Sequence, residues 1–287
     1  MLFLDAEHTR RCLPMRVAVE SQVEAFGEDI EIPLRQQLGS SLFMPGRVGR
    51  HTGMKVVSTE PGNPVGVVMV FEPDGTPAGV VDGPTLTAIR TGAGAGLATR
   101  LLAPPEARTL AMLGAGAMAF DQIEAVRAVR PIEEVLVWSR SLDRAHELAD
   151  CVGGEAVADP DEAVRAAQIV SCATPSEKPL FRPESVGEDV HINAIGAFRP
   201  GMVEVPPEIV ATAFVVVDDR RAAESEAGDL IAAERRPDAT VADLLAGRVA
   251  SPGGRTLFKS VGIASQDVAA ARAALEEARR SGIGTQL

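Results

Sequence analysis

The segment L-A-M-L-G-A-G-A-M-A-F, from Leu110 to Phe120, has the glycine spacing of a loop that binds a phosphate group. Such a loop needs a strand in front, a sharp turn, and a helix whose first amides point toward the anion. Leu110–Leu113 form an apolar strand, Gly114 permits the turn, and Gly116 lets a pyrophosphate approach the backbone. Ala119 takes the third position of the G-x-G-x-x-G/A pattern, where a small residue allows close packing. Because the pattern opens a complete β-α-β unit, it predicts a dinucleotide site.

A second glycine cluster, formed by Gly92, Gly94 and Gly96, does not fit this description. It follows the helical stretch P-T-L-T-A-I-R, and no strand precedes it. A glycine inside a helix costs about 1 kcal/mol relative to alanine, so close approach of a neighbour must compensate. We interpret this cluster as the packing face of a helix that also carries Arg90.

The type of nucleotide depends on the residues that end the next strand. The strand V-L-V-W is followed by Ser139, Arg140 and Ser141, and no acid occurs before Asp143. An acid at this point would accept a hydrogen bond from the adenine ribose and favour NAD. An arginine between two serines can instead bind a 2′-phosphate through charge-assisted hydrogen bonds. We therefore predict NADP(H) in preference to NAD(H), with a solvated loop arginine as the alternative interpretation of Arg140.

The elements that must position these residues differ between the two halves of the chain. Apolar residues from Asp5 to Phe26 fall at helical spacing and predict one or two helices. The segments M-K-V-V-S, V-G-V-V-M-V-F-E-P and P-A-G-V-V-D-G follow, separated by P-G-N-P and P-D-G-T turns. This pattern is typical of antiparallel strands. A helix from Pro84 to Leu102 comes next and ends before Pro104 and Pro105, which cannot continue it.

After residue 105, short apolar strands alternate with helices of about ten residues, a pattern typical of a parallel sheet covered on both faces. The last helix, from Gly262 to Gly282, is amphipathic and free to return to the first helices. The predicted fold class is α/β: a doubly wound Rossmann domain plus an α+β domain with an antiparallel sheet. We place the α+β domain at residues 1–105 with 264–287, and the Rossmann domain at residues 106–263.

Composition excludes several classes of function. The formal net charge of −12 argues against a nucleic-acid groove or an anionic membrane surface as partner. The three cysteines lack C-x-x-C spacing and indicate a reducing compartment, and no histidine pair has metal-ligand spacing, so we expect no metal. The N-terminus has no apolar stretch of signal-peptide length, and no apolar run is long enough to span a membrane. We expect a cytoplasmic protein.

Five segments, spread over nearly the whole chain, together resemble the ornithine cyclodeaminase/mu-crystallin family: MPGRVGRHTGMKVVSTEPGNP, DGPTLTAIRTGAGAG, LGAGAMA, INAIGAFRPGMVEV and TLFKSVGIASQDVAAA. The resemblance implies a homodimer of two-domain subunits. Its N-terminal domain, completed by the C-terminal helix, pairs the subunits and binds substrate, while the Rossmann domain binds a nicotinamide nucleotide. The family includes ornithine cyclodeaminases, alanine and opine-type dehydrogenases, and reductases of cyclic ketimines such as pyrroline-2-carboxylate.

The resemblance places the substrate carboxylate on Arg35, Lys55 and Arg90. A guanidinium fork suits a carboxylate, and a nearby ammonium can deliver a proton to the substrate nitrogen. Each residue has a structural alternative: Arg35 as a surface arginine, Lys55 as an outward-facing strand residue, and Arg90 as an ion-pair arginine.

The resemblance also extends the cofactor site. It adds Ala117 and Met118 at the helix start, Thr174, the stretch from Asn193 to Gly196, and the loop 260–262 with Val261 against the nicotinamide. For Thr174 the alternative is a turn threonine before a proline.

One departure from the family narrows the function. Cyclodeaminases carry a catalytic acid in the loop after the I-N-A-I-G strand, and Phe198 stands at the matching position here. Phenylalanine cannot exchange a proton, whereas hydride transfer to an imine does not require that acid.

The pocket around the substrate side chain has four candidate residues: Met44, Arg47, Val70 and Phe198.

We therefore predict an enzyme, an NAD(P)H-dependent reductase of small 2-imino acids or cyclic ketimines such as pyrroline-2-carboxylate. Lys55 and Arg90 are its expected catalytic residues. The alternatives are an alanine- or opine-type dehydrogenase, an ornithine cyclodeaminase, or a non-catalytic NADPH-dependent binding protein. Because a fold alone does not determine function, the choice depends on the site.

Overall fold

The structure, a computed structural model, describes residues 1–60 and 65–287; the predicted P-G-N-P turn lies outside them, at residues 61–64. The chain divides into two compact units, one formed by Met1–Gly94 with Ile263–Leu287 and the other by Ala95–Gly262. The division passes through helix α3 (Gly83–Leu102), which the sequence predicts from residue 84. The sequence places the first boundary after this helix, at residue 105.

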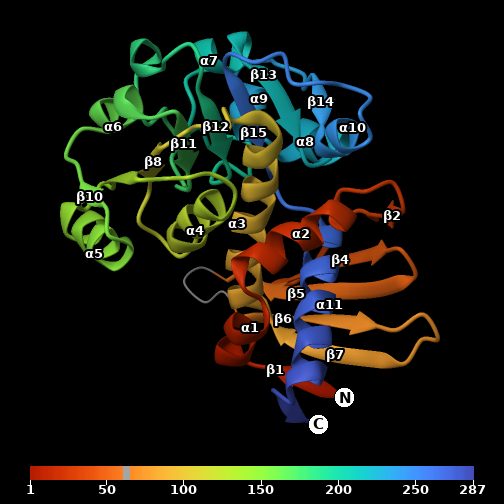
Figure 1. The fold of residues 1–287 in the computed structure, drawn as a ribbon. Coiled ribbons are helices and arrows are strands. Elements are labelled where there is room, and N and C mark those ends of the chain that lie inside the picture. The colour runs from red at the N-terminus through yellow and green to blue at the C-terminus, as the bar shows by residue number, and fades with distance from the viewer. Residues whose placement is uncertain (61–64) are drawn as a thin grey trace. The chain divides into compact units, whose positions relative to one another are not determined.

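The first unit is built on a mixed sheet in which most neighbouring strands are antiparallel (Figure 1). Its strands are β1 (Leu2–Leu4), β2 (Ile30–Glu31), β3 (Gln36–Leu38), β4 (Ser41–Val48), β5 (His51–Ser58), β6 (Gly66–Phe71), β7 (Pro77–Asp82) and β16 (Thr285–Gln286). Their order is β16-β1-β7-β6-β5-β4-β2, with β3 beside β4. The antiparallel pairing of β5, β6 and β7 confirms the prediction. The sequence did not predict β4, nor the parallel pairing of β1 with β7.

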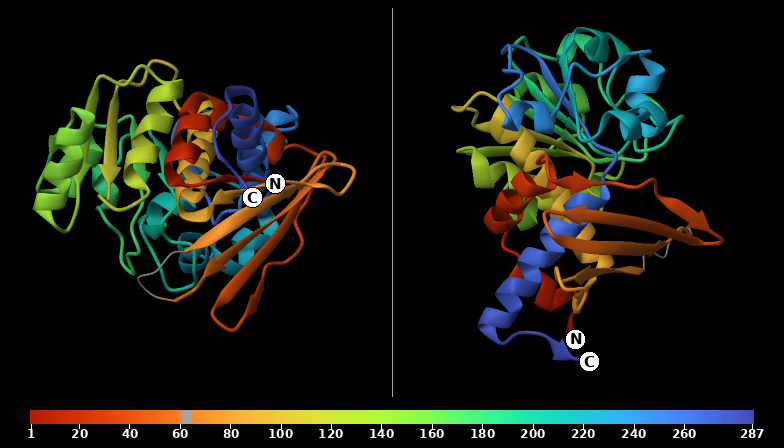
Figure 2. Two further views of the ribbon diagram at one scale, coloured as in Figure 1. Left: turned by 90° about the horizontal axis from the view of Figure 1, so that it is seen from below. Right: turned by 90° about the vertical axis from the view of Figure 1, so that its right-hand side faces the viewer.

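Helices of the first unit cover one face of this sheet (Figure 2). They are α1 (Ala6–Cys12), α2 (Met15–Ala25) and α11 (Ala264–Ser281). Helix α11 packs against strands β4 to β7 and against α1 and α2. The C-terminal helix therefore returns to the first helices, as predicted, and brings residues from the end of the chain to the antiparallel sheet.

A row of glycines lets α11 lie close to the strands. Gly46 on β4, Gly53 on β5 and Gly79 on β7 lie in one row across the sheet, with a residue of β6 between the last two. A β-carbon added to Gly46 would come within 2.9 Å of the Ala264 β-carbon, and one added to Gly53 within 2.9 Å of Val268. Larger side chains in this row would push the helix away from the sheet.

The second unit contains a fully parallel sheet. Its strands are β8 (Thr109–Leu113), β9 (Glu134–Trp138), β10 (Glu155–Ala156), β11 (Ile169–Cys172), β12 (His191–Ala194), β13 (Phe214–Val217), β14 (Ala239–Thr240) and β15 (Thr256–Lys259). Their order is β10-β9-β8-β11-β12-β15-β13-β14. The order reverses between β8 and β11, the place where doubly wound sheets bind ligands outside the carboxyl ends of their strands.

Helices cover both faces of the parallel sheet (Figure 1). They are α4 (Ala119–Val129), α5 (Leu142–Val152), α6 (Pro160–Ala166), α7 (Pro207–Thr212), α8 (Arg220–Glu226), α9 (Gly228–Ala232) and α10 (Val241–Leu245), with a 3-10 turn at Pro183–Ser185. Two separate apolar clusters form the core on either side. The predicted Rossmann-type doubly wound fold is confirmed. No helix in the described ranges is long and apolar enough to cross a membrane.

Candidate active site

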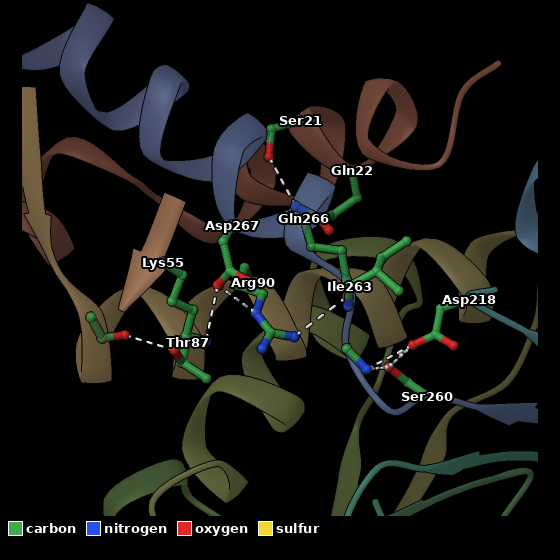
Figure 3. Close-up of polar contacts among 12 residues, drawn as sticks. Ser21, Gln22, Lys55, Thr87, Arg90, Asp218, Ser260, Ile263, Gln266 and Asp267 are labelled. Carbon is green, nitrogen blue, oxygen red and sulfur yellow. Dashed lines mark hydrogen bonds and ion pairs between the residues drawn. The ribbon is translucent and has the colours of Figure 1, made fainter. Parts of the chain in front are cut away.

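Lys55 and Arg90 converge on one buried carboxylate, that of Asp267 (Figure 3). The Lys55 ammonium on β5 donates to Asp267 Oδ1 over 3.1 Å, and Arg90 Nε on α3 donates to the same oxygen over 3.0 Å. The exposed fraction is 4% for Lys55, 6% for Arg90 and 0% for Asp267. Lys55 thus points into the unit and not outward, and the two cations are immediate neighbours.

Opposing effects set the charges in this cluster. Burial lowers the pKa of Lys55 most, the charges of Arg90 and Arg35 lower it as well, and Asp267 raises it; together these effects bring the pKa to about 8. Burial by itself would raise the pKa of Asp267, but Arg90 and Lys55 bring it below its ordinary value. Two cationic groups therefore act on the Asp267 carboxylate, and Arg35 adds a third positive charge that acts on Lys55. The excess of positive charge favours an anionic ligand.

A second contact fixes the Arg90 guanidinium. Its Nη1 donates to Gln266 Oε1 over 3.4 Å, and the same oxygen accepts from the backbone N–H of Ile263 at 3.0 Å. Gly94 lies against this side chain, because an added β-carbon would come within 2.6 Å of Gln266 Nε2. The interpretation of the second glycine cluster as a packing face is confirmed at Gly94.

Two of the pocket candidates lie on the same side of the sheet as Lys55, and Arg47 does not. Met44 pairs directly with Lys55 in the register, and Val70 is buried on the same side. Arg47 lies three residues beyond Met44, so its side chain leaves the opposite face of β4. Its guanidinium donates to Asp29 over 2.7 Å and to Glu31 over 3.0 Å. The prediction that Arg47 lines the pocket is wrong, because alternation along a strand separates it from Lys55.

The glycine loop after β8 has the geometry of a phosphate cradle. Gly114 has a φ of +119°, and an added β-carbon would lie 2.7 Å from the carbonyl oxygen of Ala173. At Gly116 an added β-carbon would meet nothing within 4 Å. Ala117 and Met118 lead into α4, whose first amides have no acceptor within the helix. A pyrophosphate placed over Gly116 would meet those amides, so the residues fit a dinucleotide.

The segment after β9 presents an arginine between two serines, one of which caps α5. Ser141 caps α5 by accepting from the N–H of Arg144 at 3.4 Å, and Ser139 accepts from the N–H of Ser141 at 3.4 Å. Arg140 is exposed between them. Its side chain can therefore reach a ligand group at the end of β9.

Glu204 holds the loops that follow β11 and β12. Its Oε1 accepts from the backbone N–H and the hydroxyl of Thr174, at 2.6 and 2.9 Å. Its Oε2 accepts from the backbone N–H of Gly196 at 2.7 Å and of Ala197 at 3.0 Å. Burial raises the pKa of Glu204 to about 7, and Lys259 opposes this rise. Thr174 and Gly196, both predicted as cofactor contacts, are thus fixed by a single carboxylate.

Two predicted cofactor positions, Asn193 and Gly196, have no side chain available for a nucleotide. Asn193 is fully buried; its Nδ2 donates to Thr99 Oγ1 over 2.9 Å, and its Oδ1 lies 3.1 Å from His191 Nε2. Gly196 leaves no room for a β-carbon, which would overlap the backbone of Thr174. A nucleotide contact at either position would have to use backbone groups.

Asp218 orders the loop after β15 (Figure 3). Its Oδ2 accepts from Ser260 Oγ at 2.9 Å and from the backbone N–H groups of Val261 and Gly262 at 2.8 and 2.7 Å. Val261, a predicted cofactor contact, is therefore held by a carboxylate at the end of β13.

Sequence reasoning missed the three acids that hold these groups, Asp267, Glu204 and Asp218. A signal for Asp267 was present, because it is an acid next to the apolar face of an alanine-rich helix. Glu204 lies just after the loop that contains Phe198, the loop in which cyclodeaminases carry their catalytic acid. Asp218 directly follows an apolar strand. Glu204 and Asp267 lie within segments that carry the family resemblance, but the resemblance assigned no role to either, because their partners are identified only by the folded structure.

Fold and site together define a class: a Rossmann-type unit joined to an α+β unit that carries a buried cationic cluster. A family model described as the ornithine cyclodeaminase/mu-crystallin family matches residues 21–282, and the chain belongs to this family. It is 32% identical to a Delta(1)-pyrroline-2-carboxylate reductase of Bacillus cereus over 100% of this chain and 99% of that protein.

Solved structures agree with this assignment. The Delta(1)-pyrroline-2-carboxylate reductase of Thermococcus litoralis, solved with NADH and L-proline, is 29% identical, with a TM-score of 0.93 and 100% coverage of both chains. An archaeal alanine dehydrogenase dimer with bound NAD is 28% identical, with a TM-score of 0.92 and coverage of 100% of this chain and 98% of that one.

Proposed function

We propose that this protein is an NAD(P)H-dependent reductase of small 2-imino acids, including cyclic ketimines such as pyrroline-2-carboxylate. The observation that carries the proposal is the convergence of Lys55 and Arg90 on one point of a buried, positively charged cluster. Such a cluster suits a substrate that presents a carboxylate beside its reacting carbon. The relatives that reduce pyrroline-2-carboxylate support the same reaction.

In the proposed reaction Arg90, assisted by Arg35 and Lys55, binds the substrate carboxylate and thereby fixes the imine carbon. Orientation of this kind can supply about 7–11 kcal/mol of the barrier reduction. A bound dihydronicotinamide would supply the hydride. The Lys55 ammonium delivers a proton to the nitrogen, and its lowered pKa makes the release of that proton easier.

The nicotinamide nucleotide would be held by the second unit. We place its pyrophosphate over Gly116, Ala117 and Met118, and we propose NADP(H) as the preferred form because Arg140 is exposed between Ser139 and Ser141. The two solved relatives carry NADH and NAD, which is the reason to test this preference directly.

An amino-acid dehydrogenase is the second candidate. The similarity to the archaeal alanine dehydrogenase favours it, since the same carboxylate site could serve oxidation of an amino acid. A cyclodeaminase is less well supported, because Phe198 in the loop after β12 offers no acid–base group.

We also propose that the outer face of the antiparallel sheet pairs two subunits. Apolar side chains form two rows on the face opposite α11: Phe43, Val56 and Val67, and Pro45, Met54 and Met69. Met54 and Val67 are each 38% exposed. Large apolar side chains that lie together and exposed on one sheet face often mark an interaction surface. A twofold interface would bury the same rows on both copies.

Three free cysteines, Cys12, Cys151 and Cys172, suit a reducing compartment, and we propose the cytoplasm.

A nucleotide-consumption assay tests the reaction. NADPH oxidation would be followed with pyrroline-2-carboxylate, piperideine-2-carboxylate, and pyruvate with ammonia or methylamine, with product amino acid measured in parallel. We expect one amino acid formed per NADPH consumed, fastest with a cyclic ketimine. Ammonia release from ornithine without net nucleotide consumption would instead identify a cyclodeaminase. Nucleotide binding without turnover of any substrate would identify a binding protein.

A further inference from the structure

Asp267 occupies an unusual position among the charged groups of the first unit. Its Oδ1 accepts from both Lys55 and Arg90, at 3.1 and 3.0 Å, while its buried Oδ2 has no hydrogen-bond partner in the described part of the chain. The carboxylate thus uses a single oxygen to hold two cations. A surface ion pair would not be built in this way, because each group would find separate partners in water.

The surroundings of the cluster leave few other sources of charge. Arg90 comes from α3, Asp267 from α11, and Arg35 from the segment before β3. The β4 and β6 neighbours of Lys55 in the register, Met44 and Val68, are apolar and buried. These groups are the ones that determine the protonation of Lys55, and Asp267 is the anionic member that acts on it.

We propose that Asp267 is a positioning residue for the carboxylate site: it holds the Lys55 ammonium and the Arg90 guanidinium side by side and maintains the charge on Lys55. The inference rests on the proposed function only for its catalytic consequence. Two adjacent buried cations repel each other, so without the carboxylate one of them would lose its proton or move away. Lysine is the group that can lose a proton, since arginine keeps its own.

The position of Asp267 also explains why the C-terminal helix is needed for the site. The acid is 212 residues from Lys55 in the sequence, and α11 carries it to the sheet because Gly46 and Gly53 allow a close approach. The end of the chain would thus control the charge of a residue on a strand near its beginning.

The protonation of Lys55 can be measured without substrate. The chain has three lysines, so protein labelled with [ε-¹³C]lysine gives three side-chain signals, and the signal lost in Lys55→Arg identifies Lys55. In wild-type protein this signal should titrate near pH 8. In Asp267→Asn the midpoint should fall by about one pH unit or more, which is at least about a tenfold loss of proton affinity. An unchanged midpoint overturns the proposal.

Two further variants keep the test decisive. Glu276→Gln removes an exposed acid from the same helix, where it pairs with Arg272, and should leave the Lys55 midpoint unchanged. Arg90→Gln retains Asp267 and removes the competing cation, so the midpoint should rise. If Asp267→Asn does not fold, the result for Arg90→Gln decides, and absence of a rise overturns the proposal.

Activity provides the catalytic readout. Asp267→Asn should lower kcat/KM for imine reduction at pH 8 by about tenfold or more, while its nucleotide affinity stays within about twofold of wild type. The falling limb of its pH profile should move to lower pH, and Asp267→Glu should restore part of the activity. A uniform loss at every pH would show a merely structural role and overturn the proposal. Failure of the wild type to reduce any imino acid would refute the proposed function and leave the lysine titration to decide this inference.

Discussion

At the scale of single residues, the site depends on a lysine that burial makes more acidic. The pKa of Lys55 is lowered to about 8, so its ammonium form dominates below this pH and is lost above it. A proton donor with a pKa near the working pH is effective because it gives up its proton readily. Arg90 differs from it, since a guanidinium keeps its charge; in the proposed reaction it would bind the substrate carboxylate.

Replacement of Lys55 by alanine tests this division of labour. We expect kcat to fall by about 10²–10⁴-fold, the usual contribution of a general acid, with nucleotide affinity unchanged. In the wild type, kcat/KM should decline above pH 8 as Lys55 loses its proton. Steady-state kinetics and a nucleotide titration measure both effects. The exposed Lys178→Ala serves as the control, and wild-type turnover in Lys55→Ala would remove this residue from the mechanism.

The choice between the two nicotinamide nucleotides is also a property of one residue. Arg140→Ala should weaken NADPH binding by about tenfold or more, the value of a hydrogen bond to a charged group, and should leave NADH binding nearly unchanged. Fluorescence titration with each nucleotide measures the ratio. Arg144→Ala, which removes an exposed arginine on α5, is the matched control. Equal effects on both nucleotides would contradict a role for Arg140 at the 2′-phosphate.

At the scale of elements, buried carboxylates fix the loops at the edge of the parallel sheet. Glu204 joins the loops after β11 and β12 through Thr174 and Gly196. Asp229 in turn accepts from the backbone N–H of Glu204 at 2.7 Å and lies 2.9 Å from the Lys259 ammonium on β15. This connected set, together with Asp218, which follows β13 and holds the loop after β15, shapes the edge where a nucleotide is expected.

Glu204→Gln tests whether this network supports nucleotide binding. The amide nitrogen of glutamine would face backbone donors, so we expect weaker binding. Because the pKa of Glu204 is raised to about 7, the wild-type carboxylate is ionised above this pH and takes up a proton below it. Wild-type affinity should therefore decline as the pH falls through 7, whereas the variant should bind equally from pH 6 to 8. The exposed Glu208→Gln on α7 is the control, and parallel pH profiles for wild type and Glu204→Gln would refute the role.

At the scale of the whole molecule, the outer sheet face predicts the oligomeric state. Met54→Asp places a charge in the middle of the two apolar rows, and its desolvation on association would be costly. We expect this variant to be a folded monomer and the wild type to be a dimer in analytical ultracentrifugation. Ile231→Asp changes an apolar residue on α9 that is 41% exposed, and should leave the dimer intact. A monomeric wild type, or a dimer that survives Met54→Asp, would exclude this face as the interface.

The sequence by itself determined the class of fold and one of the two sites. Glycine spacing, apolar strands and helices of regular length are local features, so the phosphate loop at Gly114–Gly116 and the order of most elements followed from them. The antiparallel strands β5, β6 and β7 followed from valine-rich segments and their turns. Strand β4 was missed because its proline and glycine, in S-L-F-M-P-G-R-V, are usual breakers of such a pattern.

The tertiary structure alone decided which charged groups act together. Arg47 and Lys55 are eight positions apart, yet they lie on opposite faces of the sheet because side chains alternate along strands. Asp267 meets Lys55 because a row of glycines admits α11, and Glu204 joins two loops that no sequence pattern connects. Spacing along a chain determines local elements, whereas the partners of a buried charge are determined by packing between elements distant in sequence.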